Sequence, residues 1–358
     1  MQENTSESKF DGALSISSSV SGCTLGGALS VSSFIPNAVT VIHAPSGCAH
    51  QTFSMLHAMM NDSGICAVPQ IVVSNISDRE VIFGGERALC AALDTAAAKN
   101  PDLIVMVTSC VPETIGDDCA TVCANHFASE KIIYIPTSGF LGGSSMGGEN
   151  AVLKGIAEIA APAPVKTGTV CLIGEKNLET EAEENYAEIV RLLSLLKLSV
   201  IVRFCRNEPV SALKTIGAAE CFIARDERVI PAAEFISKKF GRPLVRDFPR
   251  GLGGCMKFLK EVGAACGLDA ETIATALDAE RDYQKAALLP FVPLAGKRIF
   301  LGAEPFAGTF AVAREAMQIL GIAESDSGIL VKLPFYLPVG CAGTVKMLNL
   351  WKREVLYG

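Results

Sequence analysis

The chain of 358 residues is 49% hydrophobic and 19% charged, and its 31 basic and 38 acidic residues leave a net charge of −7. This acidic balance argues against a protein whose general surface attracts nucleic acid or an anionic membrane. An apolar content this high excludes a wholly disordered chain, and no apolar run reaches the roughly 18 residues of a membrane-spanning helix.

Short apolar runs alternate with helical stretches along the chain. Strands are expected at 103–107, 131–135, 169–173, 199–204, 221–224, 243–246 and 297–302. Helices are expected at about 113–127, 149–160, 181–196, 230–240, 253–289, 306–320 and 341–355. Apolar strands that alternate with helices are typical of parallel sheets covered on both faces. The sequence therefore predicts an α/β fold of three doubly wound domains, at 1–165, 166–295 and 296–358, the last too short to stand alone.

The N-terminal third differs chemically from the rest. No Asp, Glu, Lys or Arg occurs from Gly12 to Asn61, and all four histidines lie within the first 126 residues. The chain has thirteen cysteines, an odd number, and their spacing is not that of a small secreted protein held together by disulfides. The polar first ten residues do not have the pattern of a signal peptide. We therefore expect a reducing, cytoplasmic setting, in which cysteines stay as thiols or bind metal.

Three cysteines, Cys23, Cys48 and Cys110, lie in short segments rich in small residues, and a glycine precedes the first two. Cys110 follows a predicted strand and precedes a helix with an early Pro112, so it lies at the carboxyl edge of a parallel sheet, where such sheets bind ligands. A helix N-terminus favours the thiolate that ligates iron. The spacings of 25 and 62 residues match neither a zinc knuckle nor a ferredoxin run. From these residues alone, metal ligands and ordinary buried cysteines both stay open.

Five short segments, taken together and in order along the chain, form a more specific pattern than any one of them alone. They are Gly22-Cys23 with Leu25-Gly-Gly-Ala28, His43-Ala-Pro-Ser-Gly-Cys48, Glu80-Val-Ile-Phe-Gly-Gly-Glu86, Thr108-Ser-Cys110 with Ile115-Gly-Asp-Asp118, and Pro136-Thr-Ser-Gly-Phe-Leu-Gly142. Together they resemble the nitrogenase component 1 superfamily. That superfamily includes the catalytic subunits of nitrogenase, their cofactor-assembly relatives, the dark protochlorophyllide and chlorophyllide reductases, and the reductive cyclase of coenzyme F430 synthesis. The resemblance covers residues 20–155 well and the rest mainly in domain pattern.

The resemblance implies three Rossmann-like domains. It also implies that Cys23, Cys48 and Cys110 ligate an iron–sulfur cluster at a subunit interface. This cluster is either a 4Fe–4S cluster with a fourth ligand from elsewhere or an 8Fe–7S cluster shared between subunits. The implied partners are an ATP-dependent iron protein and either a second copy of the chain or a paralogous subunit. A second metallocofactor is left open.

The chain also departs from the family pattern. Nitrogenase holds its catalytic cofactor with a cysteine in the middle domain and a histidine in the last, whereas this chain has no cysteine at 225–228 and no histidine after His126. We therefore expect an oxidoreductase subunit that passes low-potential electrons to a small or tetrapyrrole-like substrate rather than to dinitrogen. The alternatives are a non-enzymatic scaffold for metallocofactor assembly and a metal-free α/β binding protein.

Other chemistry-bearing residues have more than one interpretation. Cys119 and Cys123 share one helix face, as core or as extra ligands. His50 and His57 line a substrate cavity, surround the ligands of the cluster, or serve packing and hydrogen bonding. We expect His43 to hold the Cys48 loop. Asp117 and Asp118 are expected on a solvated helix surface, with partner docking or proton transfer as the alternative.

Two cysteines in the later part of the chain stand at glycine-framed helix starts. Cys255 and Cys341 are candidates for a substrate site, because a helix start of this kind suits anions and thiolates. We assign the remaining cysteines to the core: Cys66, Cys90, Cys171, Cys205, Cys221 and Cys266.

The uncharged stretch from Gly12 to Asn61 then has an explanation. It contains Cys23 and Cys48, and nearby fixed charges shift the reduction potential of a buried cluster. The stretch is predicted to line the cluster and to form the face between subunits.

Overall fold

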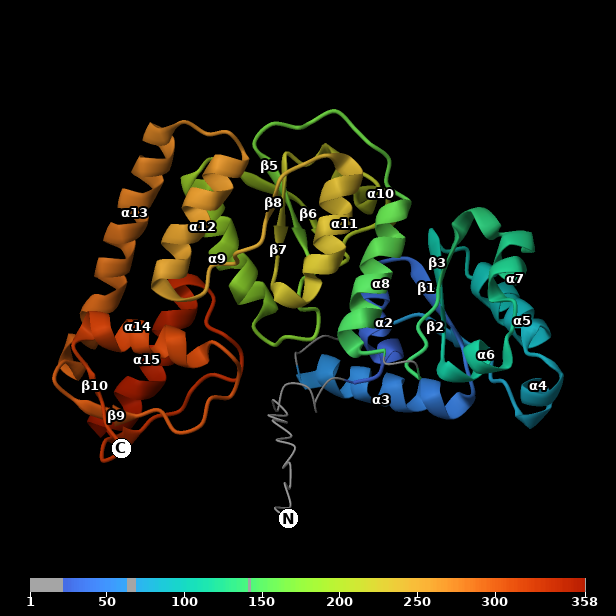
Figure 1. Ribbon diagram of the computed structural model, residues 1–358, viewed down its shortest axis with the longest axis horizontal. Coiled ribbons are helices and arrows are strands. Elements are labelled where there is room, and N and C mark those ends of the chain that lie inside the picture. Colours follow the sequence, from blue (N-terminus) through green and yellow to red (C-terminus); the bar gives the residue numbers. More distant parts are fainter. Residues whose placement is uncertain (1–21, 63–68, 141–142, 358) are drawn as a thin grey trace, which may run out of the picture.

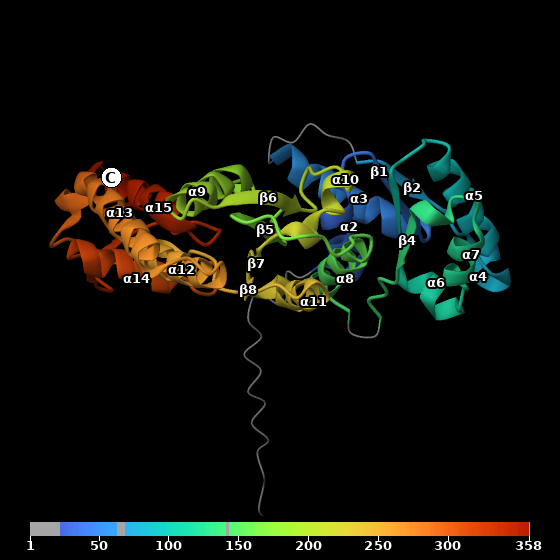
Figure 2. The same ribbon diagram turned by 90° about the horizontal axis from the view of Figure 1, so that it is seen from above.

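A computed structural model describes residues 22–62, 69–140 and 143–357. It contains three separate parallel sheets in a row along the long axis of the molecule (Figures 1 and 2). Helices cover both faces of the first two sheets, so the α/β, Rossmann-like fold that the sequence predicts is confirmed. The boundaries at 165/166 and 295/296 stay a prediction. In the described part of the chain, no helix is long and apolar enough to cross a membrane.

The first sheet has the order β2-β1-β3-β4. Its strands are β1 (Ala38–His43), β2 (Ile71–Val73), β3 (Leu103–Thr108) and β4 (Ile132–Ile135). Every residue of β1 and β3 is buried, because helices pack on both faces. One face carries α2 (Thr24–Ser32), α3 (Ser46–Asp62) and α8 (Ser145–Glu158), and the other carries α5 (Glu86–Ala97) and α7 (Cys119–Asn125). The short helices α4 (Asp78–Phe83) and α6 (Cys110–Ile115) lie at the carboxyl edge.

The second sheet has the order β6-β5-β7-β8. Its strands are β5 (Thr169–Ile173), β6 (Ser199–Phe204), β7 (Cys221–Ala224) and β8 (Leu244–Val245). Its helices are α9 (Ala182–Leu195), α10 (Val210–Leu213), α11 (Ile230–Phe240) and α12 (Gly251–Ala265). The core on the α11 side is continuous with that of the first sheet, because α8 packs against α11.

The third sheet is small, with the order β10-β9-β11. Its strands are β9 (Arg298–Phe300), β10 (Ala323–Glu324) and β11 (Ile329–Leu330). The surrounding helices are α13 (Ala270–Leu288), α14 (Thr309–Leu320) and α15 (Gly340–Tyr357). The buried indole of Trp351 on α15 lies in the core of this unit.

Two helices expected to be continuous are interrupted. The helix predicted over 113–127 is split into α6 and α7 at Gly116, whose φ of 82° belongs to the left-handed region that glycine enters without strain. The helical region predicted over 253–289 is split into α12 and α13, and Gly267 (φ 63°) lies between them. In both places a glycine ends the first helix, as glycine commonly does.

Helices α2 and α8 approach each other unusually closely. A Cβ atom on Gly27 would lie 1.8 Å from the carbonyl oxygen of Ser145, and one on Gly148 would lie 1.9 Å from that of Thr24. No side chain fits at either glycine without moving a helix. The close packing at Gly27 and Gly148 therefore fixes the position of α2 against α8, and with it the position of Cys23 at the start of α2.

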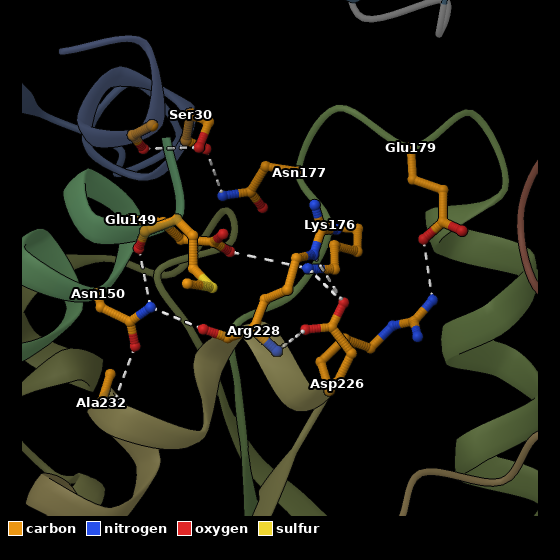
Figure 3. A network of polar contacts seen from close by, with 12 residues as sticks. Ser30, Glu149, Asn150, Lys176, Asn177, Glu179, Asp226, Arg228 and Ala232 are labelled. Atoms are coloured by element: carbon orange, nitrogen blue, oxygen red, sulfur yellow. Dashed lines mark hydrogen bonds and ion pairs between the residues drawn. The ribbon is translucent and has the colours of Figure 1, made fainter. Parts of the chain in front are cut away.

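A buried polar network joins the first unit to the second (Figure 3). Lys176 Nζ lies 2.6 Å from Asp226 Oδ2 and 3.9 Å from Glu149 Oε1, and all three side chains are less than 15% exposed. Burial acts to raise the pKa of Asp226, but Lys176 and Arg228 outweigh it and bring that pKa down to about 2. This carboxylate therefore stabilises the fold at neutral pH, and the contribution is lost as the pH falls towards 2.

Replacing this lysine tests the joint. Lys176→Met leaves Glu149 buried without its cation and leaves Asp226 with only the half-exposed Arg228 at 3.3 Å, so it is expected to lower the free energy of unfolding by about 3–5 kcal/mol, measured in urea at pH 7. The control is Lys257→Met, which removes an exposed partner 2.6 Å from Asp247 and should change little. If the two substitutions lowered the free energy of unfolding equally, burial of the Lys176 ion pairs would not be the source of their stabilising effect.

Candidate functional site

Each of the three cysteines stands at a helix start. Cys23 is the N-cap of α2, Cys48 is the third residue of α3, and Cys110 is the first residue of α6, directly after β3. Cys23 and Cys48 are exposed, whereas Cys110 is half-buried. Backbone N–H groups at helix starts favour anionic sulfur.

The fold brings these thiols into one electrostatic neighbourhood. Burial raises the pKa of the Cys48 thiol, and the nearby Cys110 and Cys23 raise it further because thiolates repel each other. The loop after β4 adds a donor, since the N–H of Gly139 lies 3.3 Å from Cys110 Sγ. Residues separated by up to 87 positions in the sequence therefore converge at the carboxyl edge of the first sheet.

Several features of the site around Cys23, Cys48 and Cys110 are compatible with a bound group that takes sulfur ligands. The hydroxyls of Thr24 and Ser109 are buried beside Cys23 and Cys110 and bond to no nitrogen or oxygen atom of the described residues. A Cβ atom on Gly47 would meet nothing within 4 Å. Among the described residues, no three Cys, His, Asp or Glu side chains converge closely enough to hold a single metal ion. Three cysteine thiols are the kind of ligand by which proteins hold iron–sulfur clusters.

His43 holds the base of the Cys48 loop. Its Nδ1 lies 2.8 Å from Ser74 Oγ, and its Nε2 lies 2.9 Å from Asp117 Oδ2. The N–H of Gly85 donates to the other oxygen of Asp117 at 2.9 Å. The imidazole is fully buried, and burial lowers its pKa although Asp117 opposes the shift. The loop-holding role expected for His43 is confirmed.

Asp117 corrects an expectation from the sequence. Its carboxylate is only 2% exposed and bonds to His43 and Gly85, so it lies neither on a solvated surface nor at a docking site. The reason is the break at Gly116, which turns Asp117 inward. Asp118, by contrast, is exposed and caps α7 by accepting from the N–H of Thr121.

Most of the other cysteines lie where the sequence places them. Cys119 and Cys123 are buried between α7 and α5, and burial raises the pKa of the first to about 12 and that of the second to about 11, so both are core thiols. Cys90, which the sequence assigns to the core, is instead exposed on α5, where it borders a pocket that α7 also lines. Cys66 lies outside the described residues. The others assigned to the core are buried: Cys171, Cys205, Cys221 and Cys266.

The starts of α12 and α15 are already occupied by carboxylates of the protein. The N–H groups of Leu252 and Gly253 donate to Glu315, and the N–H of Cys341 donates to Glu188 Oε1 at 2.8 Å. Cys255 and Cys341 are fully buried, and burial raises the pKa of each thiol. Neither helix start is open to a substrate.

A cavity of about 280 Å³ lies beyond β7 and β8, at the carboxyl edge of the second sheet. Its lining residues are Glu227, Ile230, Arg246, Asp247, Phe248 and Arg250. The sequence alone points to none of these as a site, because isolated arginines carry no motif. His50 and His57 do not line it; both are exposed on α3.

Known proteins resemble this chain over most of its length. A family model described as nitrogenase component 1 type oxidoreductase matches residues 23–322. The nitrogenase iron-molybdenum cofactor biosynthesis protein NifE of Bradyrhizobium diazoefficiens is 24% identical over 87% of this chain and 59% of its own length. One of the subunits of the light-independent protochlorophyllide reductase of Bradyrhizobium sp. is 23% identical over 82% of this chain and 57% of its own length.

A solved structure named nitrogenase Cp1 at pH 6.5 is similar in fold. Its TM-score is 0.65 and its sequence identity 18%, over 85% of this chain and 60% of that one. The chain thus spans about three fifths of the length of the relatives it matches.

Proposed function

Because this chain belongs to the nitrogenase component 1 type oxidoreductases, we propose that it is the cluster-bearing, electron-transferring subunit of a two-component reductase. In this proposal an ATP-dependent iron protein supplies the electrons and the reducible substrate is an organic molecule. The observation that carries the proposal is the convergence of Cys23, Cys48 and Cys110, together with the N–H of Gly139, at one edge of the first sheet.

These three residues would hold an iron–sulfur cluster, either 4Fe–4S or a larger one shared between subunits. When bound, such a cluster takes up and gives out electrons at low potential. The chain supplies three cysteines at helix starts, a backbone donor at 3.3 Å from one sulfur, and a segment without a fixed charge from Gly22 to Asn61. Three thiolates leave one iron of a four-iron cluster without a protein ligand, so the proposal requires a further ligand from a partner subunit.

Helix α3 presents the surface where that partner is proposed to bind. It begins at the cysteine edge and runs along one side of the molecule (Figure 1). Its exposed residues carry no charge between Ser46 and Asn61, although a helix facing water usually carries charges there. Met55 is 47% exposed on this helix, and Phe140, next to Gly139, is 71% exposed. A depletion of charged residues is typical of the core of subunit interfaces.

A second exposed apolar surface suits the iron protein. Ile82 is 72% and Phe83 81% exposed at the end of α4, which packs against α6, the helix that begins with Cys110. The following Gly85 is held by Asp117, which also holds His43. A partner that covers Phe83 would therefore contact α4, the helix that packs directly against the helix of Cys110.

The cavity beyond β7 and β8 is the proposed substrate site. Arg250 offers a guanidinium group to a carboxylate, and Phe248 and Ile230 offer apolar contacts. Arg246 also lines the cavity and pairs with Glu234 at 2.6 Å. Its lining contains neither Cys nor His, so it does not fit a second metallocofactor. A small organic anion, or the carboxylate-bearing part of a larger molecule, matches a volume of about 280 Å³.

The test is electron delivery. The complex, isolated anaerobically, is mixed with an iron protein and MgATP, and reduction of the cluster is followed by absorbance. We expect ATP-dependent reduction in the parent protein and a rate about tenfold or more lower in Phe83→Ala, because buried aromatic side chains dominate docking energies. Phe127→Ala is the control, since Phe127 is 78% exposed at the end of α7. A cluster that no iron protein reduces would contradict the proposal.

Cofactor assembly is a second candidate function, favoured by the similarity to a protein named for cofactor biosynthesis. A scaffold of this kind would accept electrons yet release an assembled metal group instead of a reduced organic product. Analysis of the small molecules and metals released during ATP-dependent turnover separates the two candidates.

A further inference from the structure

The buried hydroxyls of Ser109 and Thr24 lie beside the cysteines and lack the backbone hydrogen bonds that hydroxyls at helix starts commonly make. Ser109 is the N-cap of α6, yet its hydroxyl accepts no bond from the helix, whereas Ser144 at the same position of α8 accepts from the N–H of Gly147. Ser109 is 4% exposed and Thr24, the first residue of α2, is 6% exposed. In the described part of the protein, neither hydroxyl bonds to a nitrogen or an oxygen atom. Buried polar groups without a partner are rare and call for an explanation.

Both hydroxyls face the sulfur site. The Ser109 hydroxyl lies within hydrogen-bonding reach of the Cys48 sulfur. A Cβ atom on Gly139 would lie 3.4 Å from Thr24 Oγ1 and 3.7 Å from Cys110 Sγ, so this hydroxyl and this sulfur border the same point. The two hydroxyls, carried by different helices, therefore both border the space between the three thiols.

We propose that Ser109 and Thr24 donate hydrogen bonds to sulfur atoms of the bound iron–sulfur cluster and its cysteine ligands, and so raise its reduction potential. This inference rests on the proposed function. Hydrogen bonds to sulfur are among the features that set cluster potentials. A donor stabilises the reduced form more, because that form carries one more negative charge. The two hydroxyls are positioning residues that act through sulfur and do not touch substrate.

The experiment is a redox titration of the anaerobic complex, followed by electron paramagnetic resonance. Ser109→Ala and Thr24→Val are expected to keep the full iron content, to lower the midpoint potential, and to lower it further in combination. Ser109→Thr and Thr24→Ser keep the hydroxyl and should restore the parent potential. The matched control is Thr114→Val, because Thr114 already donates to the carbonyl oxygen of Cys110 from an exposed position.

The outcomes separate this inference from the proposed function. Full iron content with an unchanged potential in both single variants would overturn the inference and leave the proposed function standing. A parent protein without a cluster would overturn both. If Ser109→Ala does not retain iron, Thr24→Val still decides, because the two residues lie on different helices.

Discussion

Cys110→Ala is expected to abolish iron binding, and Cys48→Ala to do the same. Cys110 lies at the centre of the proposed site, between the loop that donates from Gly139 and the strand end of β3. Removing one thiolate leaves an iron of the cluster without its protein ligand, and a cluster in contact with water is lost. The measurement is iron and acid-labile sulfide per chain after anaerobic reconstitution, with a fall from about four irons to a background value for a four-iron cluster.

Cys90→Ala is the matched control, because this cysteine is free and exposed on α5, on the opposite side of the first sheet. It should keep the iron content and the absorbance of the parent protein. Iron that persists in both Cys48→Ala and Cys110→Ala, or that disappears in Cys90→Ala, would contradict the ligand assignment. Circular dichroism of each variant shows that the fold is retained.

Met55→Glu is expected to separate the subunits. Met55 lies two helical turns after Cys48 on the uncharged surface of α3 and is 47% exposed. A carboxylate in a closed, uncharged interface costs several kcal/mol without a cation, so the dissociation constant should rise by about 100-fold or more. Sedimentation velocity of the anaerobic complex measures the change, and iron should be lost with the partner that supplies the remaining ligand.

The control places the same charge elsewhere. Ala91→Glu adds a carboxylate to an exposed position of α5 and should leave both mass and iron content unchanged. A Met55→Glu protein with the parent's mass would show that α3 does not form the interface. A monomeric protein that still holds its full cluster would show that the partner supplies no ligand.

The fold was predictable where local patterns decide it. The apolar runs at 103–107 and 169–173 form buried strands of parallel sheets, as their composition predicts. The helix break at Gly116 was not predictable, because periodicity does not show which glycine adopts a positive φ. The fully helical interpretation of 253–289 fails at Gly267 for the same reason.

The site was predictable only in part. The segments around Cys23, Cys48 and Cys110 stand out because of their resemblance to a family, and the topology of the first sheet explains why they meet. The pairing of His43 with Asp117 is a contact across 74 positions, and no local pattern indicates it. The cavity escapes a sequence-based search because its two segments, 227–230 and 246–250, come together only when the second sheet folds.

Charge placement changes the interpretation of the uncharged N-terminal stretch. Part of it, α2, is uncharged because it is buried against α8 at a distance that admits only glycine. Another part, α3, is uncharged although it is exposed, and burial within this chain does not explain that. The second part is the stronger indication of a partner subunit.

The central claim is that the three cysteines hold an iron–sulfur cluster. The most direct measurement is iron and acid-labile sulfide per chain, with electron paramagnetic resonance of the reduced protein, on the complex purified without oxygen. The account predicts brown protein with about four irons for each four-iron cluster and a signal of a reduced cluster. Colourless, fully folded protein that stays free of iron after reconstitution would contradict it.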